Sequence, residues 1–265
     1  MTARTARITG LSALLTLSIA LAGCDVGGDT DKPAPLSPRD ALLKAVPATG
    51  TAAYKFEVKQ PNQTLSGTYD SSQKAFDAKG VYREEGGDLD LTLTMNALVR
   101  SEGNWVKVAF TPANLPGLPK LPKKWMKIDP SKIKDASGSF LAFDENNADP
   151  GNAHFLVMNA AGVTDKGSGE YAGTTDITMV PDAEIVDAAT LKALGAKAKA
   201  LPFTAAVDGQ GHLSSMTVQI PAAGKTKAST YSVKYSAFGQ TAVPAAPASG
   251  AQTPAPAAAY ELLNS

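Results

Sequence analysis

A strict alternation of apolar and polar residues between positions 88 and 96 constrains the fold of this chain more than any other feature. The segment reads Asp-Leu-Asp-Leu-Thr-Leu-Thr-Met-Asn, so Leu89, Leu91, Leu93 and Met95 share one side and polar residues the other. Successive side chains of a strand point to opposite faces, and a face in water alternating with a face on a core is typical of antiparallel sheets. The pattern predicts a sheet with one apolar face that another layer or a ligand has to cover.

The same period of two recurs along the chain and predicts further strands, around residues 54–58, 65–69, 105–110, 125–128, 163–180 with a break near 171–173, 203–207, 212–220 and 229–236. Short helices are predicted at 37–46, 148–160 and 187–199. The first of them has Ser37 as a candidate cap and Pro38 at the first helical position. Many strands with few helices predict an α+β fold, in which helices cover one face of an antiparallel sheet.

The first 24 residues have the layout of an export signal. Arg4 and Arg7 precede an apolar run from Ile8 to Leu21. That run is shorter than the roughly 20 residues that a membrane-spanning helix needs, so we expect the segment to be cleaved off rather than retained.

The run ends at Leu-Ala-Gly-Cys, residues 21–24, which resembles the lipobox of bacterial lipoproteins, and Cys24 is the only cysteine of the chain. The alternative is a small buried cysteine at a helix end. The resemblance implies lipidation of Cys24 by acyl chains such as palmitate, and a location at the outer face of the bacterial cytoplasmic membrane. We therefore expect a signal peptide (1–23), a lipidated flexible tether (24–36), a folded lipid-binding domain (37–240) and a disordered Pro/Ala-rich tail (241–265).

Several function classes lack their signatures in this sequence. The 25 basic and 25 acidic residues leave no basic excess for nucleic-acid binding. The histidines are His154 and His212, and without a second cysteine they cannot form a His/Cys metal cluster. Serine-hydrolase elbows, phosphate-binding loops and dinucleotide fingerprints are also missing. We expect no catalytic residues, cofactor or metal, and hence no enzyme.

Three stretches occur in order: Trp125-Met-Lys-Ile-Asp129, Tyr171-Ala-Gly-Thr-Thr-Asp-Ile177, and Phe203-Thr-Ala-Ala-Val-Asp-Gly-Gln-Gly-His-Leu213. Together with the lipobox they resemble the LppX/LprG-type lipoproteins of actinobacteria, over residues 37–237. The resemblance implies a LolA-like fold: a curved antiparallel sheet forming an unclosed half-barrel, with short helices over the concave face and an apolar cavity beneath them. It also implies a role in binding or moving acylated lipids and lipoproteins. No residue role carries over.

The chain is therefore expected to be a membrane-anchored carrier or chaperone of an acylated lipid or lipoprotein, with an envelope protein as a further partner. Alternation alone selects the residues expected to line its cavity: Leu91, Leu93, Met95, Val106, Val108, Ile177, Met179, Val218 and Ile220. Two alternatives stay open. The same residues could be plain core, in which case the chain is a non-catalytic interaction or sensor lipoprotein with a solid core. The Leu-Pro repeat at 115–124, with Lys120, Lys123 and Lys124, is either a loop at the cavity mouth or an ordinary surface loop.

Overall fold

The structure is a computed structural model that describes residues 35–84, 90–134, 141, 143, 148–179 and 185–264. The predicted signal peptide, Cys24 and the tether up to residue 34 lie outside the described residues. Leu36–Ser265 form one unit, and the following description concerns that unit.

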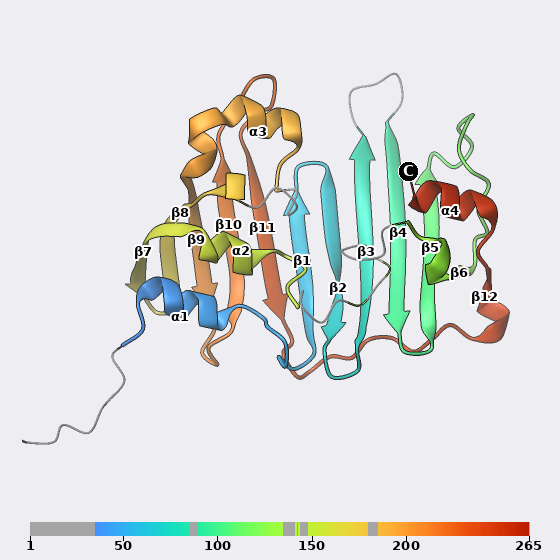
Figure 1. The fold of residues 1–265 in the computed structure, drawn as a ribbon, viewed down its shortest axis with the longest axis horizontal. Coiled ribbons are helices and arrows are strands. Elements are labelled where there is room, and N and C mark those ends of the chain that lie inside the picture. Colours follow the sequence, from blue (N-terminus) through green and yellow to red (C-terminus); the bar gives the residue numbers. More distant parts are fainter. Residues whose placement is uncertain are drawn as a thin grey trace, which may run out of the picture. The chain divides into compact units, whose positions relative to one another are not determined.

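In the described part of the chain, twelve strands form a single sheet (Figure 1). They are β1 (Tyr54–Gln60), β2 (Gln63–Asp70), β3 (Ala75–Glu84), β4 (Leu91–Arg100), β5 (Gly103–Thr111), β6 (Trp125–Ile128), β7 (Ala160–Gly167), β8 (Glu170–Thr175), β9 (Leu201–Val207), β10 (Leu213–Ile220), β11 (Ser229–Ser236) and β12 (Gln252–Pro254).

The strand order is β12-β6-β5-β4-β3-β2-β1-β11-β10-β9-β8-β7. Neighbours are antiparallel except β12 and β6, which run parallel. The order ends in two different edge strands, β12 and β7, so the curved sheet is not closed. With a few short helices, this confirms the predicted α+β class and its large, mostly antiparallel sheet.

The helices are short and lie over two separate parts of the sheet (Figure 1). Over the β7–β11 side lie α1 (Pro38–Ala45), α2 (Ala153–Met158) and α3 (Ala188–Leu194), with the 3-10 turns η2 (Ile177–Met179) and η4 (Gly195–Lys199). Over the β4–β6 side lies α4 (Ala257–Leu263), near η1 (Pro130–Lys132). Ser37 caps α1 as predicted, because its hydroxyl oxygen accepts a hydrogen bond from the Asp40 amide at 3.2 Å.

Strand register places the apolar residues on one face, which we call the helix-bearing face. Phe56 of β1 is level with Tyr235 of β11 and with Gly67 of β2, and Met95 of β4 is level with Val108 of β5. The intervening residues, such as Lys55 and Glu57, belong to the opposite face. The alternation seen in the sequence therefore sorts side chains by face along the sheet.

Two buried clusters share the helix-bearing face. The first cluster joins α1, α2 and α3 to β1 and β9–β11 through residues such as Leu42, Leu156 and Leu213. The second cluster lies on β4–β6 and contains Val106, Met126 and Ile128 under Ala259 of α4. A smaller third cluster lies on the opposite face, where Ala75, Leu98 and Trp105 pack against Val243.

The predicted disordered tail at 241–265 is wrong for the part of it that the structure describes. Residues 237–264, which we call the C-terminal strap, begin at the end of β11 and pass β1, where the Gly239 amide donates to the Ala53 carbonyl at 2.7 Å. Val243 packs on the opposite face, β12 pairs with β6, and Ala259 of α4 is fully buried on the helix-bearing face. The strap thus contacts both faces and one edge of the sheet, although its Pro/Ala composition shows no periodic pattern.

Other element boundaries shift as well. The strand predicted at 88–96 is β4, Leu91–Arg100, and the strand pair predicted within 163–180 turns at residues 168–169 rather than at 171–173. Gly167 and Gly169 have φ angles of 86° and 79°, which glycine adopts most easily, so the turn forms there. The helix predicted at 148–160 is confined to Ala153–Met158.

Candidate functional site

Five of the nine predicted cavity residues are buried, and they fall into two different clusters. Val106 and Val108 belong to the second cluster. Ile177, Val218 and Ile220 belong to the first, each at most 2% exposed. These five positions are packed core, and they do not meet in one cavity.

Met179 was predicted to line the cavity on a strand, and this is wrong. It lies in η2 rather than in a strand, and 65% of its surface is exposed. The alternation that selected it ends at Thr175, where β8 ends. A 3-10 turn does not keep the two-residue period of a strand, so a strand-based face assignment fails there.

Leu91, Leu93 and Met95 of β4 remain partly exposed on the helix-bearing face. Leu93 has apolar, half-buried neighbours level with it on both sides, Tyr82 and Phe110, whereas Leu91 is level with the exposed Glu84 at the end of β3. We call the whole set the central apolar strip; it comprises Leu65, Tyr82, Leu91, Leu93, Met95 and Phe110.

The central apolar strip connects the two clusters. Leu65 packs against the first cluster, whereas Leu93, Met95 and Phe110 pack against the second. Gly80 lies in the same face, and a Cβ there would come within 2.8 Å of the Tyr82 ring. The Tyr82 ring therefore occupies the space over the glycine, where a larger residue would leave no room for it.

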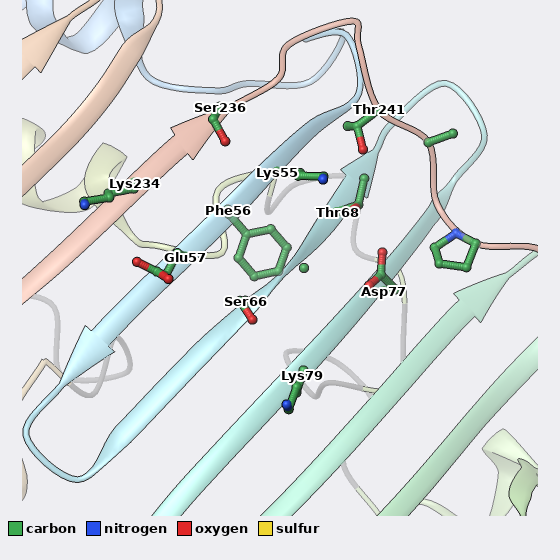
Figure 2. Close-up of a pocket in the computed structure, with 13 residues that line it drawn as sticks. Lys55, Phe56, Glu57, Ser66, Thr68, Asp77, Lys79, Lys234, Ser236 and Thr241 are labelled. Carbon is green, nitrogen blue, oxygen red and sulfur yellow. The ribbon is translucent and has the colours of Figure 1, made fainter.

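A groove of about 680 Å³ lies on the opposite face, over β1, β2, β3 and β11 (Figure 2). Its floor carries alternate residues of these strands, and the beginning of the C-terminal strap forms one side. The side chains drawn in Figure 2 come from Lys55, Phe56, Glu57, Ser66, Thr68, Asp77, Lys79, Lys234, Ser236 and Thr241, among others.

The groove has three lysines. None of them makes an ion pair with a described residue, although the charge of Lys55 acts on the nearby Asp77. Glu57 is engaged instead by Lys59, which lies outside the groove, with 2.8 Å between Nζ and Oε1. Lysine ammonium groups and serine and threonine hydroxyls donate hydrogen bonds, so the groove suits a polar, anionic group.

Asp77 is the half-buried acid of the groove. Burial raises the pKa of its carboxyl, while hydrogen bonds from Thr68 and the charge of Lys55 act in the other direction. Its Oδ1 has no hydrogen-bond partner among the described residues. The sequence did not point to this groove, since its residues look like the solvated side of ordinary strands until the register of β1, β2, β3 and β11 is known.

A buried polar network joins the segment before α2 to the sheet. Tyr235 donates to the Asp149 carboxylate, Tyr54 donates to the Ala148 carbonyl, and Tyr231 donates to the Gly151 carbonyl at 2.8 Å. Burial raises the pKa of Asp149 and of the tyrosines Tyr54, Tyr231 and Tyr235. The network satisfies buried backbone groups, so we assign it a structural role.

The two histidines lie apart from each other, and each makes contacts that stabilise the fold. The His154 amide donates to Asp149 Oδ2 at 2.7 Å, and the His212 ring stacks on Phe238 with centroids 4.2 Å apart. Within the described ranges, no three His, Cys, Asp or Glu residues are grouped as a metal site would require. No helix among these residues is long and apolar enough to cross a membrane.

The Leu-Pro repeat at 115–124 packs Leu121 against the second cluster and leaves Lys120, Lys123 and Lys124 exposed. Those lysines therefore lie on the part of the surface beside β6 and α4, away from the polar groove.

Comparison with known proteins gives no family. No protein-family model and no curated protein sequence matches the chain. Among solved structures, a porin-like protein from Bacteroides uniformis is similar over 72% of this chain and 98% of its own, with 10% identity and a TM-score of 0.20. A likeness of that strength carries no argument about fold or function.

Proposed function

We propose that this chain is a lipoprotein of the bacterial envelope, anchored through Cys24 to the outer face of the cytoplasmic membrane, that carries or chaperones an acylated lipid or lipoprotein. The observation that carries the proposal is the central apolar strip. It is a half-exposed apolar surface in the middle of the helix-bearing face, between a cluster covered by α1–α3 and a cluster covered by α4.

An acyl chain fits such a strip for an energetic reason. Moving an apolar chain from a bilayer to an apolar protein surface exchanges one oil-like environment for another, while the passage through water costs about 0.8 kcal/mol per exposed CH₂. For transfer to be reversible, the acyl chain needs only to have a similar free energy on the strip and in the bilayer. The proposal includes the LolA-like half-barrel, which an unclosed curved sheet with helices on one face supports.

The test is a substitution on the strip with a matched control on the same strand. In a Cys24→Ser chain, Leu93→Trp is expected to keep the domain folded and to reduce binding of a fluorescent acyl probe about tenfold, because the indole fills the place of the chain. Thr94→Trp puts the same ring on the opposite face and is expected to leave binding unchanged. Equal binding by both variants, or equal loss in both, would remove the strip as the ligand site.

Native mass spectrometry of the Cys24→Ser chain tests the ligand directly. The chain has to include the C-terminal strap, because α4 completes the second cluster. Co-purified lipid that is lost in Leu93→Trp supports the carrier.

The lipid anchor is tested separately. Cys24→Ser is expected to abolish incorporation of labelled fatty acid and to leave the fold intact, since residues 1–35 are not part of the unit that contains both clusters. Undiminished labelling of the mutant would refute the lipobox interpretation.

A second candidate is an interaction lipoprotein with a solid core, and the polar groove is the observation that favours it. Lys79 and Lys234 would receive an acidic segment of an envelope protein. Lys79→Glu with Lys234→Glu is then expected to abolish cross-linking to that protein in the envelope, while Leu93→Trp is expected to have no effect. The reverse pattern, with acyl binding lost only in Leu93→Trp, favours the carrier.

A further inference from the structure

Helix α2 is apolar on both of its sides. Ala153, Leu156 and Val157 are buried and face the sheet, whereas Phe155 and Met158 are 43% and 47% exposed. At 100° per residue, Phe155 and Met158 point away from the sheet, opposite the buried set. A surface helix normally presents polar residues there. Burial in the fold therefore does not explain these two side chains.

The remaining large exposed apolar side chains belong to elements next to α2, and we call α1, α2 and η2 together the α1–α2–η2 layer. Met179 lies in η2, which is joined to α2 because the Asp176 amide donates to the Asn159 carbonyl at 3.1 Å. Leu36, 56% exposed, immediately precedes α1, and α1 packs against α2. Among the described residues, the four large hydrophobic side chains with the greatest exposure are thus attached to α1, α2 and η2.

Positive charge adjoins this layer. Turn η4 packs against η2 and carries Lys197 and Lys199, and α3 directly before it carries Lys192. All three lysines are exposed, and residues 188–199 contain no acidic side chain. Aromatic and apolar side chains flanked by exposed lysines are the pattern of protein surfaces that lie in the headgroup region of an anionic bilayer.

The chain before Leu36 limits how far this layer can lie from the membrane. If Cys24 is lipidated, only the 11 residues 25–35 connect it to Leu36. Whatever their conformation, these residues cannot reach further than about 40 Å, the length of a fully extended chain. The layer that contains α1 is where the tether joins the domain, so the tether holds it within reach of the bilayer.

We propose that Phe155, Met158 and Met179, with Lys192, Lys197 and Lys199, form a docking surface for an anionic lipid bilayer. The inference rests on the membrane anchor of the proposed function, but not on its ligand strip. The anchor confines the protein to the membrane, and this surface orients the domain with α2 and η2 in the headgroup layer. Lipid exchange through the helix-bearing face would then begin from a domain already in contact with its lipid source.

The experiment uses the Cys24→Ser chain, so that only the surface mediates binding. Its sedimentation with vesicles of phosphatidylglycerol and phosphatidylcholine is compared with that on pure phosphatidylcholine. Phe155→Ser with Met158→Ser is expected to weaken binding to the anionic vesicles about tenfold. Lys197→Glu with Lys199→Glu is expected to do the same and to abolish the preference for anionic lipid.

Lys123→Glu with Lys124→Glu is the control, since it makes the same charge change on the far part of the sheet. It is expected to leave binding unchanged, and an equal loss there would show that general charge, not this surface, mediates binding. Failure of the Cys24→Ser chain to sediment with anionic vesicles would also overturn the proposal.

A second measurement does not depend on mutants that weaken binding. In the Cys24→Ser chain, Met158→Cys supplies a single site for an environment-sensitive fluorophore. On anionic vesicles the label is expected to shift to shorter wavelength and to be quenched by brominated lipid, while the same label at Lys123→Cys stays in water. An unshifted label at position 158 would contradict the orientation. Retained acyl-probe binding in such a case would leave the carrier proposal standing on its own.

Discussion

The two clusters on the helix-bearing face are built from different parts of the chain, and this makes them differ in kind. The first cluster is closed by α1–α3 and is held by a buried polar network around Asp149. The second cluster is smaller and is closed by α4, at the far end of the C-terminal strap. One sheet is therefore covered twice. One cover consists of α1, which precedes all the strands in the chain, with α2 and α3, which lie between strands; the other is α4, which follows all of them.

The comparison teaches where the fold is vulnerable. The first cluster depends on close approach of backbone and sheet, as at Gly151, where a Cβ would come within 2.2 Å of Val233 Cγ2. The second cluster depends on whether the strap stays in place. Both tryptophans, Trp105 and Trp125, lie on β5 and β6 in the third cluster, on the opposite face, and Trp105 Nε1 donates to Gln252 Oε1 of the strap at 2.8 Å. Tryptophan fluorescence therefore reports on whether the strap stays in place, whereas Tyr54, Tyr231 and Tyr235 belong to the first cluster.

Deleting residues 252–265 has the largest expected effect. The deletion removes β12 and α4, including the half-buried Tyr260, Leu262 and Leu263, and uncovers the second cluster. We expect a loss of about 4 kcal/mol in the free energy of unfolding, since each well-buried large side chain contributes roughly 1.5–3 kcal/mol.

The loss is measured by urea unfolding followed by tryptophan fluorescence. Hydrogen exchange is expected to accelerate in β5 and β6 and to stay slow in β10 and β11, because each cluster has its own cover. An unchanged midpoint would support the disordered tail that composition predicts.

Gly151→Ala breaks the first cluster instead. The new methyl group collides with Val233 and with the Tyr235 hydroxyl, 2.6 Å away, so α2 has to move off the sheet. We expect a loss of about 3 kcal/mol in thermal or urea unfolding, as for other overpacked cores. Gly209→Ala is the control, because its Cβ would meet nothing within 4 Å. Similar losses in both variants would show that chain entropy, not the collision, sets the effect.

Tyr260→Phe tests a single polar contact of the strap. The Asp129 amide donates to the Tyr260 hydroxyl at 2.9 Å, and the ring lies under Lys132 Nζ at 5.3 Å. Removing the hydroxyl is expected to cost about 1 kcal/mol, the net value of one such hydrogen bond. The second cluster is expected to stay closed, with tryptophan emission unchanged. A loss as large as that of the deletion would mean that this contact alone holds α4.

Asp149→Asn is expected to lower the stability, because the Asn NH₂ replaces an oxygen that accepts a buried hydrogen bond, and also to change its pH dependence. Burial raises the pKa of Asp149 above its unfolded value of about 3.9, so the folded protein binds the proton more tightly. Stability therefore falls as the pH rises from about 4 through that raised pKa. Urea midpoints measured across this range are expected to become flatter in Asp149→Asn.

Asp187 supplies a control, because its pKa is shifted in the opposite direction to that of Asp149. Hydrogen bonds from Thr190 lower the pKa of its carboxyl, so its contribution is present above the unfolded pKa and is lost as the pH falls. Asp187→Asn is expected to remove part of the acid sensitivity. Identical pH profiles for both variants would exclude the buried carboxyl as the source of the difference.

Much of the sheet could be predicted from the sequence, because alternation is a local pattern. Trp125–Ile128 is a strand as predicted, and β9, β10 and β11 follow each other as the predicted meander. The cap at Ser37 was also readable, since capping involves residues only three positions apart. The candidate site was less predictable: of nine selected positions, Leu91, Leu93 and Met95 alone reach the central apolar strip.

The other six positions failed for a physical reason. Alternation says on which face a side chain lies but not what covers that face. Val106 and Val218 lie on the same face as Leu93, yet both are fully buried. Val106 belongs to the second cluster, which α4 covers, and Val218 belongs to the first cluster, which α1–α3 cover. Met179 was assigned by extending a strand period into a 3-10 turn.

The sequence by itself determined the strand-rich α+β class and the division of side chains between two faces, since both follow from neighbours in the chain. Tertiary structure decided the rest. It paired β1 with β11 and β12 with β6, separated two clusters on one face, and placed Lys55, Lys79 and Lys234 around one groove. It also ordered the C-terminal strap, whose Tyr260 bonds to a residue 131 positions earlier. Such contacts join segments that are far apart in the sequence. No local pattern indicates them, because they contribute to stability only after the chain has folded.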